Sequence, residues 1–159
     1  MSTRNLERLI QLATDVFAAK SDPEQLDVDE KIVARLKAIH PSTVSEYADE
    51  NGPAAWVLVI PTTTEVMNQF VTKKITEKQL LDLTPSNTKY DALYLCSALT
   101  LPEYREKGIT KKLTLDAIES IRKTHSIKKL FVWPFTKQGE YLANSIASSL
   151  SLPILKRPH

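Results

Sequence analysis

Residues 91–124 read DALYLCSALTLPEYREKGITKKLTLDAIESIRKT and combine an apolar run, a short polar turn and an amphipathic segment. The run 92–101 is apolar or β-favouring at nearly every position, which is typical of a strand buried on both faces. The turn 102–108 is polar and ends in Gly108. Beyond it, one apolar residue recurs per helical turn on one face. The pattern predicts a buried strand, a tight turn and a helix.

This arrangement suits an anion. The first turn of a helix carries unpaired backbone N–H groups, and its dipole favours negative charge. Gly108 would let the backbone approach a ligand where a Cβ would obstruct it. The basic residues around this point are Arg105, Lys107, Lys111 and Lys112. The alternative is a plain strand-turn-helix unit with a solvated basic turn, although cations in the first turn of a helix oppose its dipole.

The segment 102–113, PEYREKGITKKL, resembles the acyl-CoA signature of the GNAT acetyltransferase superfamily, Arg/Gln-x-x-Gly-x-Gly/Ala. Arg105 and Gly108 match the signature. Thr110 stands where Gly or Ala is usual, and its hydroxyl would either crowd the phosphates or donate to them. The resemblance implies that the loop holds the pyrophosphate of coenzyme A and that the preceding strand pairs with the pantetheine arm. The implied coenzyme-binding residues are Leu99, Thr100, Leu101, Arg105, Glu106, Lys107, Gly108, Ile109, Thr110 and Lys111.

The resemblance also implies an α/β, GNAT-like three-layer fold with a central mixed sheet of about five to six strands flanked by helices. The length of 159 residues predicts a single domain. Within it we expect N-terminal helices over 1–40, a β-hairpin over 41–61, a helical insertion over 62–84 and an acyl-CoA-binding core over 91–157. The insertion is unusual for the family, and it would either shape substrate choice or simply cover the sheet.

The individual elements follow from periodicity, caps and breakers. We expect helices over 4–19 and from Asp22 onward, with the better part of the second helix running to His40. The expected strands cover 43–48, 54–60, 92–101, 128–135 and 151–157, and the later helices cover 65–73, 76–83, 109–124 and 136–150. The unit 92–135 should be a right-handed parallel crossover.

The amino-acid composition excludes several classes of protein and of binding site. Three glycines cannot supply a dinucleotide-binding or P-loop glycine motif, and the three histidines have no zinc spacing, so we expect no metal. No apolar run approaches the length of a membrane span. The lone Cys96 makes the cytoplasm the default compartment. Residues 101–159 hold 11 Lys/Arg against 5 Asp/Glu, an excess that suits an anionic small ligand; basic and aromatic residues do not interleave as a nucleic-acid face requires.

The implied chemistry is transfer of an acetyl group from acetyl-CoA to an amine by direct attack. A backbone N–H near Leu99 to Leu101 would polarise the thioester carbonyl. Tyr141 is the candidate general acid, although it lies earlier in its helix than the family tyrosine, and Glu65 is a weaker candidate base.

Two hypotheses of different class follow. The first is an active acyl-CoA-dependent N-acetyltransferase acting on an unidentified amine acceptor. The second is a GNAT-like module that binds acyl-CoA or a protein partner without turnover. A third, formation of a homodimer through the N-terminal helices, rests only on their apolar stripes.

Overall fold

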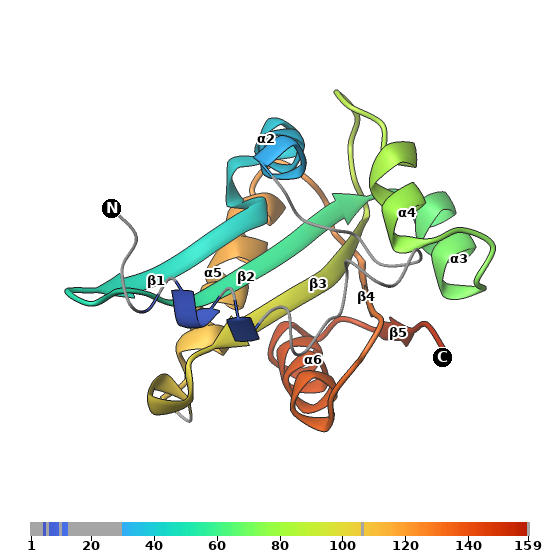
Figure 1. Ribbon diagram of the computed structural model, residues 1–159. Coiled ribbons are helices and arrows are strands. Elements are labelled where there is room, and N and C mark those ends of the chain that lie inside the picture. Colours follow the sequence, from blue (N-terminus) through green and yellow to red (C-terminus); the bar gives the residue numbers. More distant parts are fainter. Residues whose placement is uncertain (1–4, 6, 10, 13–29, 106, 159) are drawn as a thin grey trace.

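The computed structural model describes residues 5, 7–9, 11–12, 30–105 and 107–158 (Figure 1). Helix α2 covers Glu30–Ile39, and a 3₁₀ turn, Pro41–Thr43, follows it. The strands are β1 (Val44–Asp49), β2 (Gly52–Thr62), β3 (Ala92–Thr100), β4 (Lys129–Val132) and β5 (Ile154–Lys156). The later helices are α3 (Thr64–Val71), α4 (Glu77–Leu83), α5 (Ile109–Arg122) and α6 (Lys137–Leu150).

The strands form one mixed sheet in the order β1-β2-β3-β4-β5. The pairs β1–β2 and β2–β3 are antiparallel, and the pairs β3–β4 and β4–β5 are parallel. The parallel pairs are connected through α5 and α6, because a parallel connection must cross from one end of the sheet to the other. Figure 1 shows α5 behind β1 and β2, with α3 and α4 together at one side of the sheet.

Alternate strand residues divide the core into two layers. One layer packs α2, α3 and α4 against the first face of the sheet, and the other packs α5 and α6 against the second. On β3, β4 and the residue directly after β4, the first face carries Tyr94, Cys96, Phe131 and Trp133, whereas the second carries Leu93, Leu95, Leu130 and Val132. The unbroken apolar run 92–96 therefore reflects a strand covered on both sides.

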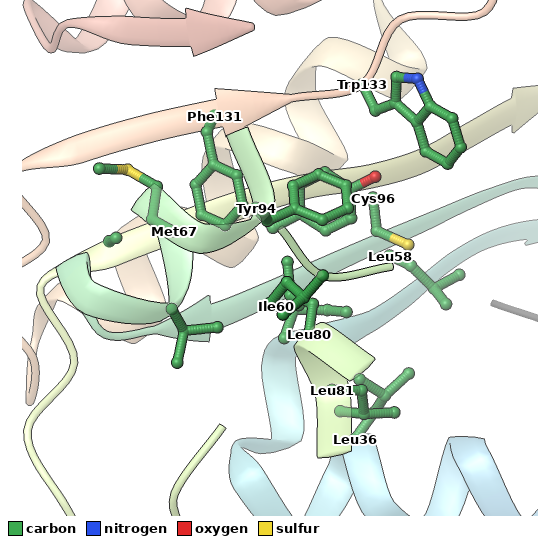
Figure 2. Packing of buried hydrophobic residues seen from close by; sticks show 14 residues of the cluster. Leu36, Leu58, Ile60, Met67, Leu80, Leu81, Tyr94, Cys96, Phe131 and Trp133 are labelled. Atoms are coloured by element: carbon green, nitrogen blue, oxygen red, sulfur yellow. The ribbon is translucent and has the colours of Figure 1, made fainter. Parts of the chain in front are cut away.

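Aromatic rings fill the first layer, part of which Figure 2 shows. Phe70 of α3 is fully buried, and its ring makes edge contacts with Tyr94, Phe131 and Trp133 at centroid distances of 5.0, 5.9 and 6.1 Å. Such edge-to-face pairs are favourable beyond the area that they bury. Phe70 thus connects the inserted helices to the two central strands.

The inserted helices are also fixed by polar contacts. Thr76 and Gln79 form a reciprocal capping box at the start of α4. Arg157, just after β5, is 2% exposed and lies over the rings of Phe70 and Trp133 at 4.4 and 4.8 Å. Its Nη1 donates to the carbonyl oxygens of Phe70 and Ile75 at 2.8 and 2.6 Å. The buried guanidinium of Arg157 therefore binds carbonyl oxygens at and just after the C-terminal end of α3, where helix carbonyls attract positive charge.

The predicted fold class is confirmed, and the predicted strands and helices from residue 30 onward are present. Strand β4 ends at Val132, three residues short of the prediction, because Pro134 has no N–H to donate to a neighbouring strand. Residues 13–29, where the end of the first predicted helix and the start of the second fall, lie outside the described residues. None of the helices in the described ranges combines the length and hydropathy that a membrane span requires.

Replacing Phe70 tests its role in the first layer. We expect Phe70→Ala to lower the free energy of unfolding by about 3–5 kcal/mol, because it removes a buried ring and leaves a cavity. Urea denaturation measures the change. Leu83→Ala is the matched control, since Leu83 is 50% exposed and its loss should cost about 0.5 kcal/mol or less. Equal effects of the two substitutions would contradict this account of the core.

Candidate functional site

The loop between β3 and α5 forms a tight reversal. Leu101 is buried, and its N–H donates to the carbonyl of Ala54 at 2.9 Å. A 3₁₀ turn over Pro102–Tyr104 follows. Gly108 then adopts the left-handed conformation (φ 73°) as the N-cap of α5. A side chain rarely adopts this conformation, so glycine is required here for backbone geometry. A Cβ at Gly108 would meet nothing within 4 Å, which leaves open space where a ligand could approach.

The first turn of α5 has no side-chain cap from Gly108. The first intrahelical bond to be closed there is from the N–H of Lys112 to the carbonyl of Gly108, at 3.0 Å. The backbone N–H groups of Ile109, Thr110 and Lys111 precede that bond and point out of the helix end. Arg105 and Lys107 are exposed beside them. Positive charge and free donors therefore converge on one spot, as an anion site requires.

Two side chains organise this loop from within. The Nε of Arg105 donates to the carbonyl of Thr100 at 3.0 Å, which folds the guanidinium back over the end of β3. The hydroxyls of Thr100 and Thr110 are hydrogen-bonded to each other. Thr110 therefore joins the first turn of α5 to the last residue of β3, a role that the sequence did not indicate.

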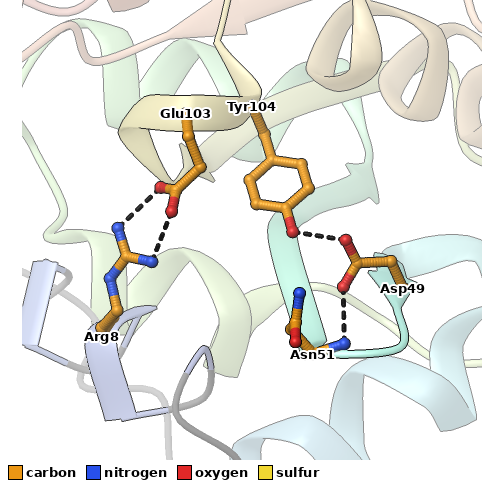
Figure 3. Close-up of polar contacts among 5 residues, drawn as sticks. All are labelled: Arg8, Asp49, Asn51, Glu103 and Tyr104. Carbon is orange, nitrogen blue, oxygen red and sulfur yellow. Dashed lines mark hydrogen bonds and ion pairs between the residues drawn. The ribbon is translucent and has the colours of Figure 1, made fainter.

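Contacts from distant segments hold the loop from outside (Figure 3). The hydroxyl of Tyr104 donates to the carboxylate of Asp49 at the tip of the β1–β2 hairpin, and that carboxylate also accepts from the N–H of Asn51 at 2.9 Å. The bond to Tyr104 lowers the pKa of Asp49. On the other side, both terminal nitrogens of Arg8 donate to Glu103 at 2.6 Å. Sequence reasoning missed both tethers, because their partners are 55 and 95 residues apart.

Strands β3 and β4 part beside this loop. Their pairing covers only Ala92–Leu95 against Lys129–Val132. Cys96 is an extra residue on β3, because Leu58 of β2 is paired with Ser97 and Val59 with Leu95. Such a bulge bends the strand and increases its twist. From Cys96 to Thr100, β3 therefore has no partner on the side of β4 among the described residues.

The parted edge exposes backbone donors. Neighbouring residues of a strand point their N–H groups to opposite edges, and the N–H of Leu101 points to β2. The N–H groups of Thr100 and Ala98 consequently point to the open edge. The expectation of a donor among Leu99 to Leu101 that polarises a thioester stays a prediction, for which the Thr100 N–H is available, whereas the Leu101 N–H is already bonded to Ala54.

A cavity of about 90 Å³ lies at the parting of the strands. Its wall combines the bulged part of β3, the segment after β4, and one face of α6. The lining is mainly apolar and includes Val57, Cys96, Ala98, Val132, Phe135 and Ile146. The volume suits a small group or the end of a narrow chain, and the body of a larger ligand would have to lie outside it.

The predicted site residues separate into two sets. Leu99, Thr100, Leu101, Arg105, Lys107, Gly108, Ile109, Thr110 and Lys111 lie together at the loop and the adjoining ends of β3 and α5, while Glu106 lies outside the described residues. Tyr141 is 77% exposed on α6 and is not among the residues that line the cavity. Glu65 is exposed at the start of α3, near the first residues of β3 and so at the opposite end of the sheet from the loop. Within the described part of the chain, no group of three or more His, Cys, Asp or Glu side chains could hold a metal ion.

Solved structures with a related fold are known. Naa20 from Chaetomium thermophilum, in complex with a bisubstrate analogue, matches with a TM-score of 0.50 and 13% identity over 86% of this chain and 65% of that one. The GphF GNAT-like decarboxylase in complex with isobutyryl-CoA matches with a TM-score of 0.47 and 14% identity over 75% of this chain and 60% of that one. A third match is the aminoglycoside acetyltransferase meta-AAC0020 from an uncultured soil metagenomic sample, in complex with trehalose. Its TM-score is 0.49, with 16% identity over 90% of this chain and 77% of that one.

The chain has the GNAT fold, as its sequence predicted. At such identities the likeness shows the fold alone. The chain spans 65% of the length of the Naa20 structure and 60% of that of the decarboxylase. No family model matches the sequence, and no curated protein does.

The tether of Tyr104 to the hairpin can be tested without a ligand. We expect Tyr104→Phe to raise the hydrogen-exchange rates of the loop amides over 103–108 by about 2- to 10-fold, because one hydrogen bond restrains that loop. The midpoint of global unfolding should not change. Tyr141→Phe removes an exposed hydroxyl elsewhere and is the control. Loop exchange as slow as in the unmodified protein would show that the hairpin does not restrain the loop.

Proposed function

We propose that this protein is an acyl-CoA-dependent N-acyltransferase that moves an acetyl group from acetyl-CoA to an amine. One observation carries the proposal: the strands part directly beside an uncapped helix N-terminus with a left-handed glycine. Phosphates suit the helix end, and a narrow chain with hydrogen-bonding amides suits the open edge of β3. Coenzyme A combines these two parts in one molecule.

The proposed binding mode assigns a role to each part of the loop. The N–H groups of Gly108, Ile109, Thr110 and Lys111 bind the pyrophosphate, and Arg105 and Lys107 add positive charge. The pantetheine arm lies along β3 between Cys96 and Thr100. The acyl group enters the cavity, where the N–H of Ala98 or Thr100 polarises the thioester carbonyl. Holding the donor in this way makes attack by the amine nearly unimolecular.

Coenzyme binding is the first test. At about 100 times its dissociation constant, acetyl-CoA or coenzyme A should add about 2.7 kcal/mol to stability, which is several degrees of melting temperature for this chain length. Arg105→Ala should reduce this shift. Arg122→Ala is the matched control, because Arg122 is also exposed but lies at the far end of α5. No shift in the unmodified protein would overturn the proposed function.

The catalytic acid requires a separate test. Tyr141 stays the sequence-based candidate, and as the acid it predicts that Tyr141→Phe lowers turnover at least about tenfold. Turnover is measured as coenzyme A release with a thiol reagent. Unchanged turnover would remove Tyr141 from the mechanism, and its exposed position favours that result.

The alternative is a module that binds acyl-CoA without turnover. The exposure of Tyr141 favours it, because the fold then lacks the acid that the sequence indicated. Ligand-dependent stabilisation without coenzyme A release in the presence of amines would establish this alternative.

A further inference from the structure

The cavity at the parted strands is built mainly from the core layer between the sheet and helices α5 and α6. Val57, Val59 and Leu95 line it from the sheet. Ala143 and Ile146 line it from α6. Each of these five side chains is 9% exposed or less. This part of the wall therefore belongs to the hydrophobic core.

The cavity also reaches the open edge of β3. Cys96 and Ala98 line it, and both belong to the stretch of β3 that has no partner on the side of β4 among the described residues. The N–H of Ala98 points to that edge, whereas Thr100 is not among the residues that line the cavity. A thioester whose carbonyl oxygen accepts from the Ala98 N–H therefore has its acyl chain beside this cavity.

The lining offers no charge to a ligand. None of the lining residues in the described part of the chain is acidic, basic or a histidine. The Thr114 hydroxyl already donates to the carbonyl of Thr110 at 2.8 Å, and the Thr136 hydroxyl accepts from the N–H of Gly139 at 2.9 Å. Burial raises the pKa of the Cys96 thiol well above its usual range, so the thiol is neutral. Such a wall suits an apolar occupant, because a carboxylate buried without a partner is costly.

The volume exceeds the need of an acetyl group. A group the size of a water molecule takes up about 30 Å³, so the cavity has room for about three carbon groups. An acetyl group has a single carbon beyond its carbonyl and would leave about two thirds of that space empty. Protein interiors are close-packed, and unfilled volume lowers stability. A butyryl group, with its three carbons beyond the carbonyl, matches the space.

We propose that the preferred acyl donor of this protein is a short, uncharged acyl-CoA of about four carbons, such as butyryl-CoA, rather than acetyl-CoA. This inference rests on the proposed acyl transfer and specifies its donor. The three apolar carbons of the chain fill the cavity between β3 and α6, and the thioester carbonyl is bonded to Ala98.

The reaction balances as it does for an acetyl group. An ammonium acceptor gives one proton to solvent, and the neutral nitrogen attacks the carbonyl carbon to form the C–N bond. The C–S bond breaks with its electron pair on sulfur. The sulfur takes the second proton from nitrogen, and the products are an amide and coenzyme A.

Binding measures the preference without any acceptor. Titration calorimetry gives the dissociation constants of coenzyme A and of its acetyl, propionyl, butyryl, pentanoyl, hexanoyl and malonyl thioesters. Burying one methylene group is worth about fourfold in affinity, so butyryl-CoA should bind about 15-fold more tightly than acetyl-CoA. Hexanoyl-CoA should bind no more tightly than butyryl-CoA, because the cavity is then full. Malonyl-CoA should bind no more tightly than acetyl-CoA, because its carboxylate would be buried without a partner.

Two variants change the size of the cavity. Ala143→Leu fills it and should reduce the affinity ratio of butyryl-CoA to acetyl-CoA to about one. Ile146→Val takes one methylene group from the wall and should move the preference to pentanoyl-CoA. This small change also decides the matter if Ala143→Leu does not fold. Ala147→Leu is the matched control, because Ala147 is buried one turn further along α6 but is not among the residues that line the cavity, and the ratio should stay as in the unmodified protein.

The outcomes separate this inference from the proposed function. A maximum of affinity at butyryl-CoA that moves to pentanoyl-CoA in Ile146→Val supports the inference. Equal affinities for acetyl-CoA and butyryl-CoA, a rise that continues through hexanoyl-CoA, a malonyl-CoA affinity equal to that of butyryl-CoA, or a maximum that neither variant changes overturns it and leaves the proposed acyl transfer standing. If neither coenzyme A nor any of its thioesters binds, both are overturned.

Discussion

The parallel pairing of β3 with β4 ends after Leu95 and Val132. One local cause acts at this point: the extra residue Cys96 bends β3. Continued pairing would satisfy the amides of Ala98 and Thr100 and close the cavity. The open edge, the cavity and the approach to the first turn of α5 therefore all depend on the end of this pairing.

The loop beside the open edge is held mainly by polar contacts on the surface. Tyr104 with Asp49 and Arg8 with Glu103 connect it to the hairpin tip and to the described N-terminal residues. Exposed ion pairs contribute little to stability and are screened by salt. The arrangement positions a segment whose backbone donors face solvent, while the buried layers on the two faces of the sheet provide the stability of the fold.

The fold followed closely from local sequence signals. The capping box at Thr76, the His40–Pro41 break and the two-sided strand at 92–100 each act through neighbouring residues, so one sequence is enough to detect them. The loop of the candidate site was predicted for the same reason.

The remaining contacts of the structure could not be predicted from local sequence signals. Asp49 meets Tyr104 only after the β1–β2 hairpin has paired with β3, and Glu77 meets Tyr94 only after α4 has packed on the sheet. Tyr141 falls in the expected helix, but helical phase places its side chain outward. The sequence did not indicate that Glu77 is buried either, because an acidic residue in the first turn of a helix is ordinarily explained by the helix dipole.

The connection between β2 and β3 is long although the two strands are direct neighbours. Thr62 is paired with Ala92, so residues 63–91 leave and re-enter the sheet at a single point. The entropy of closing such a loop grows only slowly with its length. Loop closure therefore sets little limit on the length of this segment, and a change of length need not alter the register of the sheet, provided that the buried residues of α3 and α4 still cover its first face. In a GNAT fold built this way, the two faces of the sheet are free to diverge at different rates.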